Sequence, residues 1–300
     1  MLTAAMAKRP LRSLSDLIDR RVEEVIRESQ DERALLLREV EDLRSRVRAL
    51  HLLLDGAGRG TARTPSWADL GKLEGEITLV AGVSREVAQR NVHSAFRLLV
   101  ALESLGVGRI AGSTMNVCGK LATIPLLDAP NDDVLEIGTL YGLFAAGMLR
   151  MLERVGRSPQ LTVVDPLIGN QLQPGATMHA DASGTPVDEK AVRTNLSLAG
   201  TAGNAARVQV GFSTDPAVRA AAGDRKYGLL VIDGDHSYEG VRADLEWAEE
   251  LVAPGGLIVL DDYGDRKWHG VQKALDEHLT GSTRMTLLGR VATSGYVRAT

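Results

Sequence analysis

Hydrophobic residues in the C-terminal half of the chain fall into short runs that are separated by longer amphipathic stretches. Each run is four to six residues long, which is the length of a strand buried in a sheet. The runs are residues 134–137, 161–164, 207–210, 227–232, 257–260, 285–288 and 296–299. Helical patterns fit between the earlier runs, and this alternation predicts an α/β domain with a mostly parallel sheet covered on both faces.

Two of the expected helices span residues 141–155 and 238–252. In the second, Val241, Leu245, Ala248 and Val252 recur on one face, and Ser237 precedes the helix where a cap is needed. Ligands of parallel sheets bind beyond the carboxyl ends of the strands. The polar residues that follow each strand are therefore the candidates for function.

A different pattern, at heptad spacing, occupies residues 14–54. Leucines fill the d positions at Leu36, Leu43 and Leu50, and the a positions are Val40, Val47 and Leu54. β-Branched residues at a with Leu at d favour a parallel two-stranded coiled coil, so we expect a homo-oligomer, a dimer, through this helix. The seam is interrupted at Ser29 and Arg33. The alternative is one amphipathic helix that packs on its own catalytic domain.

The chain therefore divides into four parts. Residues 1–55 form the N-terminal helix, and a glycine-rich stretch over 56–66 is a linker. Residues 67–130 are expected to be a mainly helical lid or substrate region, with a helix over 86–105 and a loop over 111–120. Residues 131–300 form the α/β domain.

Charge and composition exclude several partners. The formal charge of −4 gives no bulk attraction to phosphate, so no nucleic-acid partner is expected. No apolar run reaches the ~18 residues of a membrane span, and we find no signal peptide. The single cysteine, Cys118, allows no internal disulfide. These features predict a cytoplasmic location.

The first three strands end in residues that suit a nucleoside ligand. The sequence after the first is E-x-G-x-x-x-G, which differs from the G-x-G-x-x-G of dinucleotide sites. Its acidic residue, Glu136, suits a cationic amino group, whereas Asp165 after the second strand can accept both hydroxyls of a ribose. Phe212 and Ser213 after the third could bracket a purine. The alternatives are a solvated carboxylate for Glu136 and a cap before Pro166 for Asp165.

With these strand ends in this order, the chain resembles the class I S-adenosylmethionine-dependent methyltransferases, which have a Rossmann-like fold. It is most similar to small-molecule O-methyltransferases of the catechol type and of the sugar type related to macrocin O-methyltransferase, over about residues 130–300. The resemblance implies cofactor contacts from all of these strand ends. The implied residues are Glu136, Gly138, Thr139, Tyr141, Gly142, Asp165, Phe212, Ser213, Asp233 and His236.

Carboxylates cluster after the fourth and fifth strands. Asp233, Asp261 and Asp262 offer the hard oxygen ligands that Mg²⁺ or Mn²⁺ prefers, and metal-dependent relatives carry acidic residues at these places. Such an ion would acidify and orient an acceptor hydroxyl. Neighbouring residues of a strand point to opposite faces, so Asp261 and Asp262 converge only if pairing stops there. The alternative is a turn at Asp233 and a solvated loop at 261–262.

His236, three residues after Asp233, is the predicted catalytic base, because a histidine that titrates near neutrality can take the hydroxyl proton. Equally, it could contact the cofactor or cap a helix without proton transfer. His179 is a weaker candidate, and Trp268 and His269 could line the acceptor pocket. The segments 166–186 and 106–130 are expected to shape that pocket.

The sequence therefore predicts methyl transfer to a hydroxyl of a small molecule, a sugar or a glycosylated natural product. Two alternatives stay open. One is a non-catalytic coiled-coil protein with a degenerate cofactor domain. The other is a metal-dependent hydroxylase on the same fold, although its iron site needs two histidines and one carboxylate.

Overall fold

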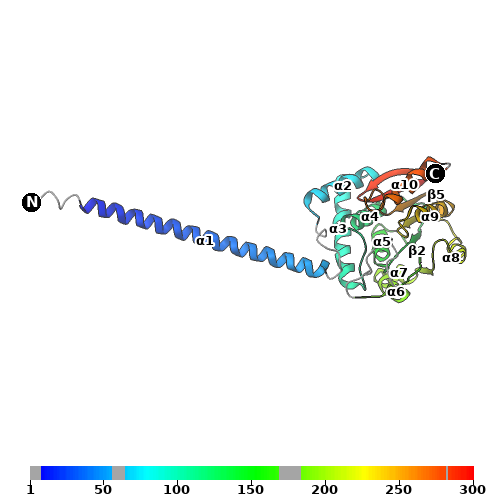
Figure 1. Ribbon diagram of the computed structural model, residues 1–300, viewed down its shortest axis with the longest axis horizontal. Coiled ribbons are helices and arrows are strands. Elements are labelled where there is room, and N and C mark those ends of the chain that lie inside the picture. Colours follow the sequence, from blue (N-terminus) through cyan, green and yellow to red (C-terminus); the bar gives the residue numbers. More distant parts are fainter. Residues whose placement is uncertain (1–7, 56–64, 169–183, 282) are drawn as a thin grey trace, which may run out of the picture. The chain divides into compact units, whose positions relative to one another are not determined.

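The computed structural model describes residues 8–55, 65–168, 184–281 and 283–300, and the chain divides into two compact units, Met1–Leu52 and Leu53–Thr300. Most of the predicted linker, 56–66, lies outside the described residues. Figure 1 shows the elements of both units. None of the described helices combines the length and the apolar character that crossing a membrane requires.

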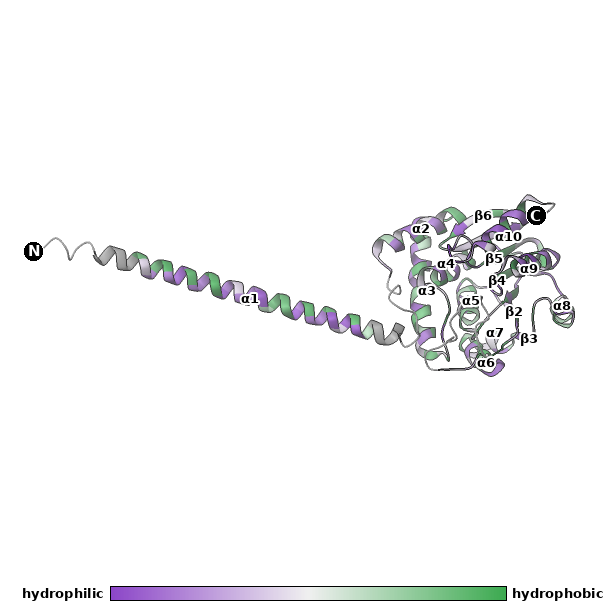
Figure 2. Ribbon diagram, viewed as in Figure 1, coloured by the Kyte–Doolittle hydropathy of each residue, from purple (hydrophilic) through white to green (hydrophobic). Residues whose placement is uncertain are grey.

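One long helix, α1 (Lys8–Asp55), accounts for the described part of the first unit, as the heptad pattern predicts. Figure 2 shows hydrophobic and hydrophilic residues interleaved along it. Its described large apolar side chains are exposed, from 42% at Val40 to 66% at Leu17, although these are residues that ordinarily lie inside proteins. The helix is confirmed, whereas its pairing with a second copy stays a prediction.

The second unit is built around a seven-stranded sheet in the order β3-β2-β1-β4-β5-β7-β6. The strands are β1 (Asp133–Ile137), β2 (Gln160–Asp165), β3 (Arg207–Val210), β4 (Tyr227–Ile232), β5 (Val252–Leu260), β6 (Met285–Val291) and β7 (Ser294–Ala299). The first five are parallel, and β7 pairs antiparallel with both β5 and β6. All seven predicted strands and the mostly parallel, Rossmann-like sheet are confirmed.

Helices cover both faces of this sheet. They are α5 (Leu143–Glu153), α6 (Glu189–Leu196), η2 (Ser197–Ala199), α7 (Gly200–Asn204), α8 (Pro216–Ala222), α9 (Tyr238–Leu251) and α10 (His269–Thr280). Successive strand residues alternate between two hydrophobic cores. Val134 and Leu229 join the core under α5, whereas Leu135 and Leu230 join the core under α9 and α10. The predicted cap of α9 is confirmed, because Ser237 Oγ accepts a hydrogen bond from Gly240 N at 3.0 Å.

The helical region before the sheet packs in the same compact unit, and it contains α2 (Trp67–Ala81), α3 (Arg85–Leu105), α4 (Thr114–Thr123) and η1 (Ile124–Leu126). The predicted loop over 111–120 is wrong from Thr114 onward, because this stretch forms α4. Ser113 caps the helix by accepting from Asn116 N at 3.1 Å, and all its residues except Met115 are buried. Burial of one whole helix outweighs the weak helix propensity of its Gly, Thr and Asn residues.

Candidate active site

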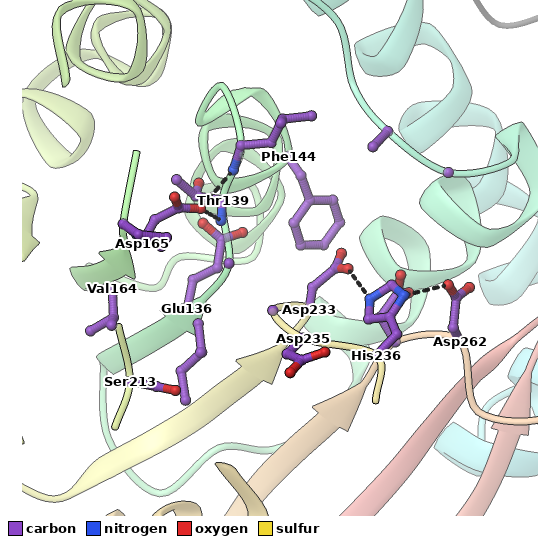
Figure 3. A pocket seen from close by; sticks show the side chains of 18 of the residues that line it. Glu136, Thr139, Phe144, Val164, Asp165, Ser213, Asp233, Asp235, His236 and Asp262 are labelled. Atoms are coloured by element: carbon purple, nitrogen blue, oxygen red, sulfur yellow. Dashed lines mark hydrogen bonds and ion pairs between the residues drawn. The ribbon is translucent and has the colours of Figure 1, made fainter. Parts of the chain in front are cut away.

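A cavity of about 560 Å³ lies at the carboxyl ends of the parallel strands. The carboxylates expected there from the sequence all line it: Glu136, Asp165, Asp233, Asp261 and Asp262. Figure 3 shows Glu136 and Asp165 at one side and the cluster of Asp233, His236 and Asp262 at the other. The structure therefore brings the predicted site residues from four strands around one crevice.

The turn after β1 is held by Asp165. Its Oδ2 accepts hydrogen bonds from the backbone N–H groups of Thr139 (2.7 Å) and Leu140 (3.0 Å), and its Oδ1 accepts from Leu167 N (2.8 Å). Gly138 has φ +83°, and a Cβ there would lie 2.2 Å from the Asp233 carbonyl oxygen. The glycine therefore lets the loops after β1 and β4 touch at the floor of the cavity.

Glu136 is a deeply buried carboxylate of the site. Its side chain is 1% exposed, and Oε2 has no hydrogen-bond partner among the described residues. Burial raises the pKa of this carboxyl group to about 8, although Thr139 partly opposes the shift. A buried polar atom without a partner is rare and points to a missing ligand. A cationic amino group would satisfy it.

Two residues of the same turn do not reach the cavity. Tyr141 is fully buried, and its hydroxyl donates to the Thr185 carbonyl at 2.7 Å. Gly142, with φ +76°, starts α5 and lies against Val192 of α6. Neither residue lines the cavity, because the chain has already turned toward the core at this point. The cofactor contacts expected of these two residues stay a prediction, and the cavity lining does not include them.

The end of the cavity near β3 contains an acidic residue that the sequence analysis missed. Phe212 and Ser213 line it as expected, and Asp244 of α9 lies there too. Burial raises the pKa of Asp244 to about 6, and its Oδ1 has no partner in the described part of the chain. The sequence did contain a signal for Asp244: it lies on the same helix face as Val241 and Leu245, where a carboxylate is unusual unless it has a function.

A buried lysine joins the carboxylates after β4 and β5. Lys120 of α4 lies 2.9 Å from Asp233 Oδ2 and 2.6 Å from Asp261 Oδ1, and its side chain is 3% exposed. Its Nζ is 4.6 Å from the centre of the Phe144 ring. Burial disfavours the charged ammonium, but the two carboxylates outweigh burial and the pKa of Lys120 is raised. The sequence analysis missed this residue because it placed 111–120 in a loop.

Asp261 has three side-chain partners. Its Oδ1 accepts from Asn116 Nδ2 (2.8 Å) and Ser294 Oγ (3.1 Å) as well as from Lys120. Burial and the nearby Asp233 carboxylate raise the pKa of Asp261, whereas at Asp233 the cations Lys120 and His236 outweigh burial and the pKa is lowered. Of the two carboxylates, Asp261 therefore accepts a proton more readily.

His236 lies between two carboxylates. Its Nε2 is 3.4 Å from Asp233 Oδ1, its Nδ1 is 3.2 Å from Asp262 Oδ2, and the ring meets Trp268 edge-on at 5.1 Å. Burial disfavours the imidazolium, but the two carboxylates outweigh burial and raise the pKa of His236 to about 10. The expected titration near neutrality therefore does not fit this environment, in which the histidine holds its proton at pH 7.

The two consecutive aspartates after β5 both face the cavity. Strand pairing stops at Leu260, and Asp262 has φ +54°, which breaks the strand alternation. The geometric condition for their convergence is therefore met. Asp262 pairs with His236, whereas Asp261 pairs with Lys120.

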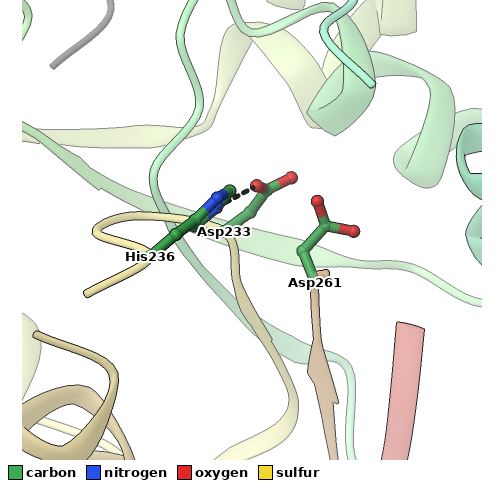
Figure 4. A group of neighbouring side chains, drawn as sticks. All are labelled: Asp233, His236 and Asp261. Carbon is green, nitrogen blue, oxygen red and sulfur yellow. Dashed lines mark ion pairs between the residues drawn. The ribbon is translucent and has the colours of Figure 1, made fainter. Parts of the chain in front are cut away.

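Figure 4 shows the one group in the described chain whose spacing could hold a metal: Asp233, His236 and Asp261, with ligand atoms within 4.8 Å of one another. As placed, these side chains do not fit a divalent ion. A histidine must be neutral to ligate, and the Lys120 ammonium already lies on the two carboxylate oxygens. A divalent ion about 4 Å from this ammonium would be repelled by roughly 8 kcal/mol at an effective dielectric constant of about 20.

Only some of the other residues expected near the acceptor line the cavity. Trp268 lines the cavity, whereas His269 is exposed at the start of α10 and does not. His179 lies outside the described residues. Parts of both segments expected to shape the acceptor pocket line the cavity, namely Arg109–Gly112 and Pro166. Of the described histidines, His236 alone lines it, so the second histidine of an iron hydroxylase site is not found there.

Comparison with known proteins finds a family match over this part of the chain. Residues 135–263 match a family described as "Methyltransferase domain". No curated protein matches the chain. Among solved structures, an O-methyltransferase from Bacillus cereus in complex with SAH is 17% identical, with 70% of this chain and 90% of that chain covered and a TM-score of 0.43. The O-methyltransferase NovP is 20% identical, with 76% and 98% covered and a TM-score of 0.47.

A third structure, of CalS11, a TDP-rhamnose 3'-O-methyltransferase of calicheamicin biosynthesis, is 17% identical, with 78% and 96% covered and a TM-score of 0.43. The family match falls on the strands and loops that form the cavity. Residues 135–263 therefore match a methyltransferase domain, and they lie in a mostly parallel, Rossmann-like sheet.

Proposed function

We propose that the protein transfers the methyl group of S-adenosylmethionine to a hydroxyl of a small molecule. The observation that carries this proposal is the buried Glu136 carboxylate, whose Oε2 lacks a partner in the described chain beside a glycine turn. The amino group of the cofactor's methionine moiety is a cation of the right size for this place. The cavity of about 560 Å³ also falls in the ordinary range for small-molecule sites.

The remaining contacts follow from the order of the strands. The Asp165 carboxylate keeps lone pairs beyond its three backbone bonds and can accept from the ribose hydroxyls. Ser213 and Asp244 offer an acceptor for the amino group of adenine at the β3 end. This assignment leaves the cluster after β4 and β5 for the acceptor hydroxyl.

Methyl transfer needs alignment more than acid–base chemistry. S-adenosylmethionine, when bound, supplies an activated methyl group whose bond to sulfur breaks as the bond to the acceptor oxygen forms. The protein orients the hydroxyl in line and takes up its proton. Asp261 is the best placed proton acceptor, because its pKa is raised and it lines the cavity. The His236 imidazolium adds positive charge near the developing alkoxide.

A sugar or a glycosylated natural product is the acceptor class that we propose. Trp268 offers an aromatic ring in the lining of the cavity, and Asp235 adds a polar group to the same lining. Polyhydroxylated rings use both kinds of contact. The N-terminal helix has a separate role in this proposal, which is to join two copies of the chain through its heptad seam.

The test is transfer of a radiolabelled methyl group from S-adenosylmethionine to a panel of glycosides and catechols. Glu136→Gln should raise the KM for S-adenosylmethionine by roughly 10- to 100-fold, which is the worth of one charge-assisted hydrogen bond. The matched control is Glu246→Gln, an exposed carboxamide substitution on α9, which should behave like the wild type. Labelled product from no acceptor in the panel, together with no cofactor binding, would contradict the proposal.

A further inference from the structure

We propose that the ammonium group of Lys120 is a built-in cation that takes the place of a divalent metal ion at the acceptor site. It would hold and stabilise the acceptor oxygen, so that methyl transfer proceeds without metal. This inference rests on the proposed function for its catalytic meaning. Its structural part, a lysine in a cation site, can be tested separately.

The first support is the place of the ammonium group. Lys120 Nζ lies between Asp233 and Asp261, the carboxylates that follow two neighbouring parallel strands. Those are also two of the three residues whose spacing suits a metal. A lysine ammonium has three N–H donors, and two are used by these carboxylates. The third remains for a ligand oxygen in the cavity, which Lys120 lines.

The second support is the helix that carries the lysine. Asn116 and Lys120 are one turn apart on α4, so they share a face and both reach Asp261 Oδ1. Every residue from Asn116 to Thr123 is buried, and Ser113 caps the start of the helix. A side chain on such a packed element is held in place before any ligand arrives, as electrostatic catalysis requires.

The third support is the lack of room for an ion among these side chains. Lys120 lies against Asp233 and Asp261, and His236 lies between Asp233 and Asp262. An ion that used Asp233 and Asp261 would also have to displace Lys120 into space that the core and the Phe144 ring occupy.

The experiment is a Mn²⁺ titration followed by electron paramagnetic resonance, with the wild type, Lys120→Met and Lys120→Arg. Methionine keeps the length and removes the charge, whereas arginine keeps the charge. We expect no wild-type binding below the millimolar range, at least about tenfold tighter binding in Lys120→Met, and none in Lys120→Arg. The gain should disappear in Lys120→Met with Asp233→Asn.

Submillimolar Mn²⁺ binding by the wild type would overturn the proposal, and so would the absence of any gain in Lys120→Met. If circular dichroism shows that Lys120→Met does not fold, Lys120→Gln replaces it and is judged by the same outcomes. Calorimetry with S-adenosylhomocysteine on the same samples separates the two claims. Wild type that binds neither ligand would contradict the proposed function, whereas wild type that binds both would contradict only the role of Lys120.

Discussion

If Glu136 binds the amino group of the cofactor as proposed, cofactor binding is expected to release a proton. Burial raises the pKa of this carboxyl group to about 8, so it is mostly protonated at pH 7 in the free protein. A cationic amino group against Oε2 favours the ionised form, and binding of S-adenosylhomocysteine should therefore release close to one proton per site. Calorimetry at pH 7 in two buffers of different ionisation enthalpy measures that number.

The raised pKa of Glu136 also makes the stability of the folded protein depend on pH. Because the pKa of Glu136 is raised on folding, the folded protein binds this proton more tightly, and the contribution is lost as the pH rises from about 4.5 to about 8. Glu136→Gln should abolish the proton release, and Glu246→Gln should not alter it. Identical binding enthalpies in both buffers for the wild type would rule out a protonated Glu136.

Gly138 is a second residue whose role is local. A Cβ at this position would lie 2.2 Å from the Asp233 carbonyl oxygen, and the backbone has φ +83°. We expect Gly138→Ala to lower the free energy of unfolding by about 3 kcal/mol or more, from strain and from the clash. Gly255→Ala is the matched control, because φ is +76° there and no atom lies within 4 Å.

The control should cost about 1 kcal/mol, the strain alone. Urea denaturation of both variants gives the comparison. Equal losses at the two glycines would mean that the loops after β1 and β4 do not touch as described.

At the scale of elements, the strands were predictable and one helix was not. The runs that form β1, β2, β4, β5 and β7 are continuously hydrophobic because these strands are buried on both faces. The edge strands β3 and β6 are less buried. The segment that forms α4 contains Gly, Ser, Thr and Asn, which favour turns when nothing else intervenes. Its burial, mainly against α3 and α2, decides that it is helical, and burial of this kind depends on contacts that the local sequence does not show. Lys120 was missed for the same reason.

Some features of the candidate site could also be predicted from the sequence, and others could not. Glu136, Asp165, Asp233 and the pair after β5 were predictable, because parallel strands bring their carboxyl ends to one edge. The orientation of Tyr141 and the charge state of His236 were not, since each depends on neighbours from other elements.

The start of α4 offers a direct test of that element. Ser113 Oγ accepts from Asn116 N, so Ser113→Ala should lower the free energy of unfolding by about 1 kcal/mol. Ser104→Ala in α3 is the control, because the exposed Ser104 hydroxyl only bonds a carbonyl one turn earlier and caps no helix. That change should stay within about 0.5 kcal/mol of the wild type. A larger loss of unfolding free energy in Ser104→Ala than in Ser113→Ala would contradict the helix start at Ser113.

At the scale of the whole molecule, the account predicts a dimer through α1. Val40 and Val47 are the a positions of the seam, and both side chains are exposed in the single chain. Val40→Glu with Val47→Glu should convert the dimer to a monomer in sedimentation velocity, because four carboxylates would meet at the seam. Arg38→Glu with Ser45→Glu adds the same glutamates on the outer face and should leave the dimer intact. A monomeric wild type would contradict the coiled-coil prediction.

The central claim is that the cavity at the sheet edge binds S-adenosylmethionine with its amino group at Glu136. A crystal structure of the protein with S-adenosylhomocysteine tests this claim most directly. The account predicts the ligand's amino group within hydrogen-bonding distance of Glu136 Oε2, its ribose at Asp165, and its sulfur turned toward Lys120 and Asp261. A ligand bound elsewhere, or bound here with Glu136 left unpartnered, would contradict it.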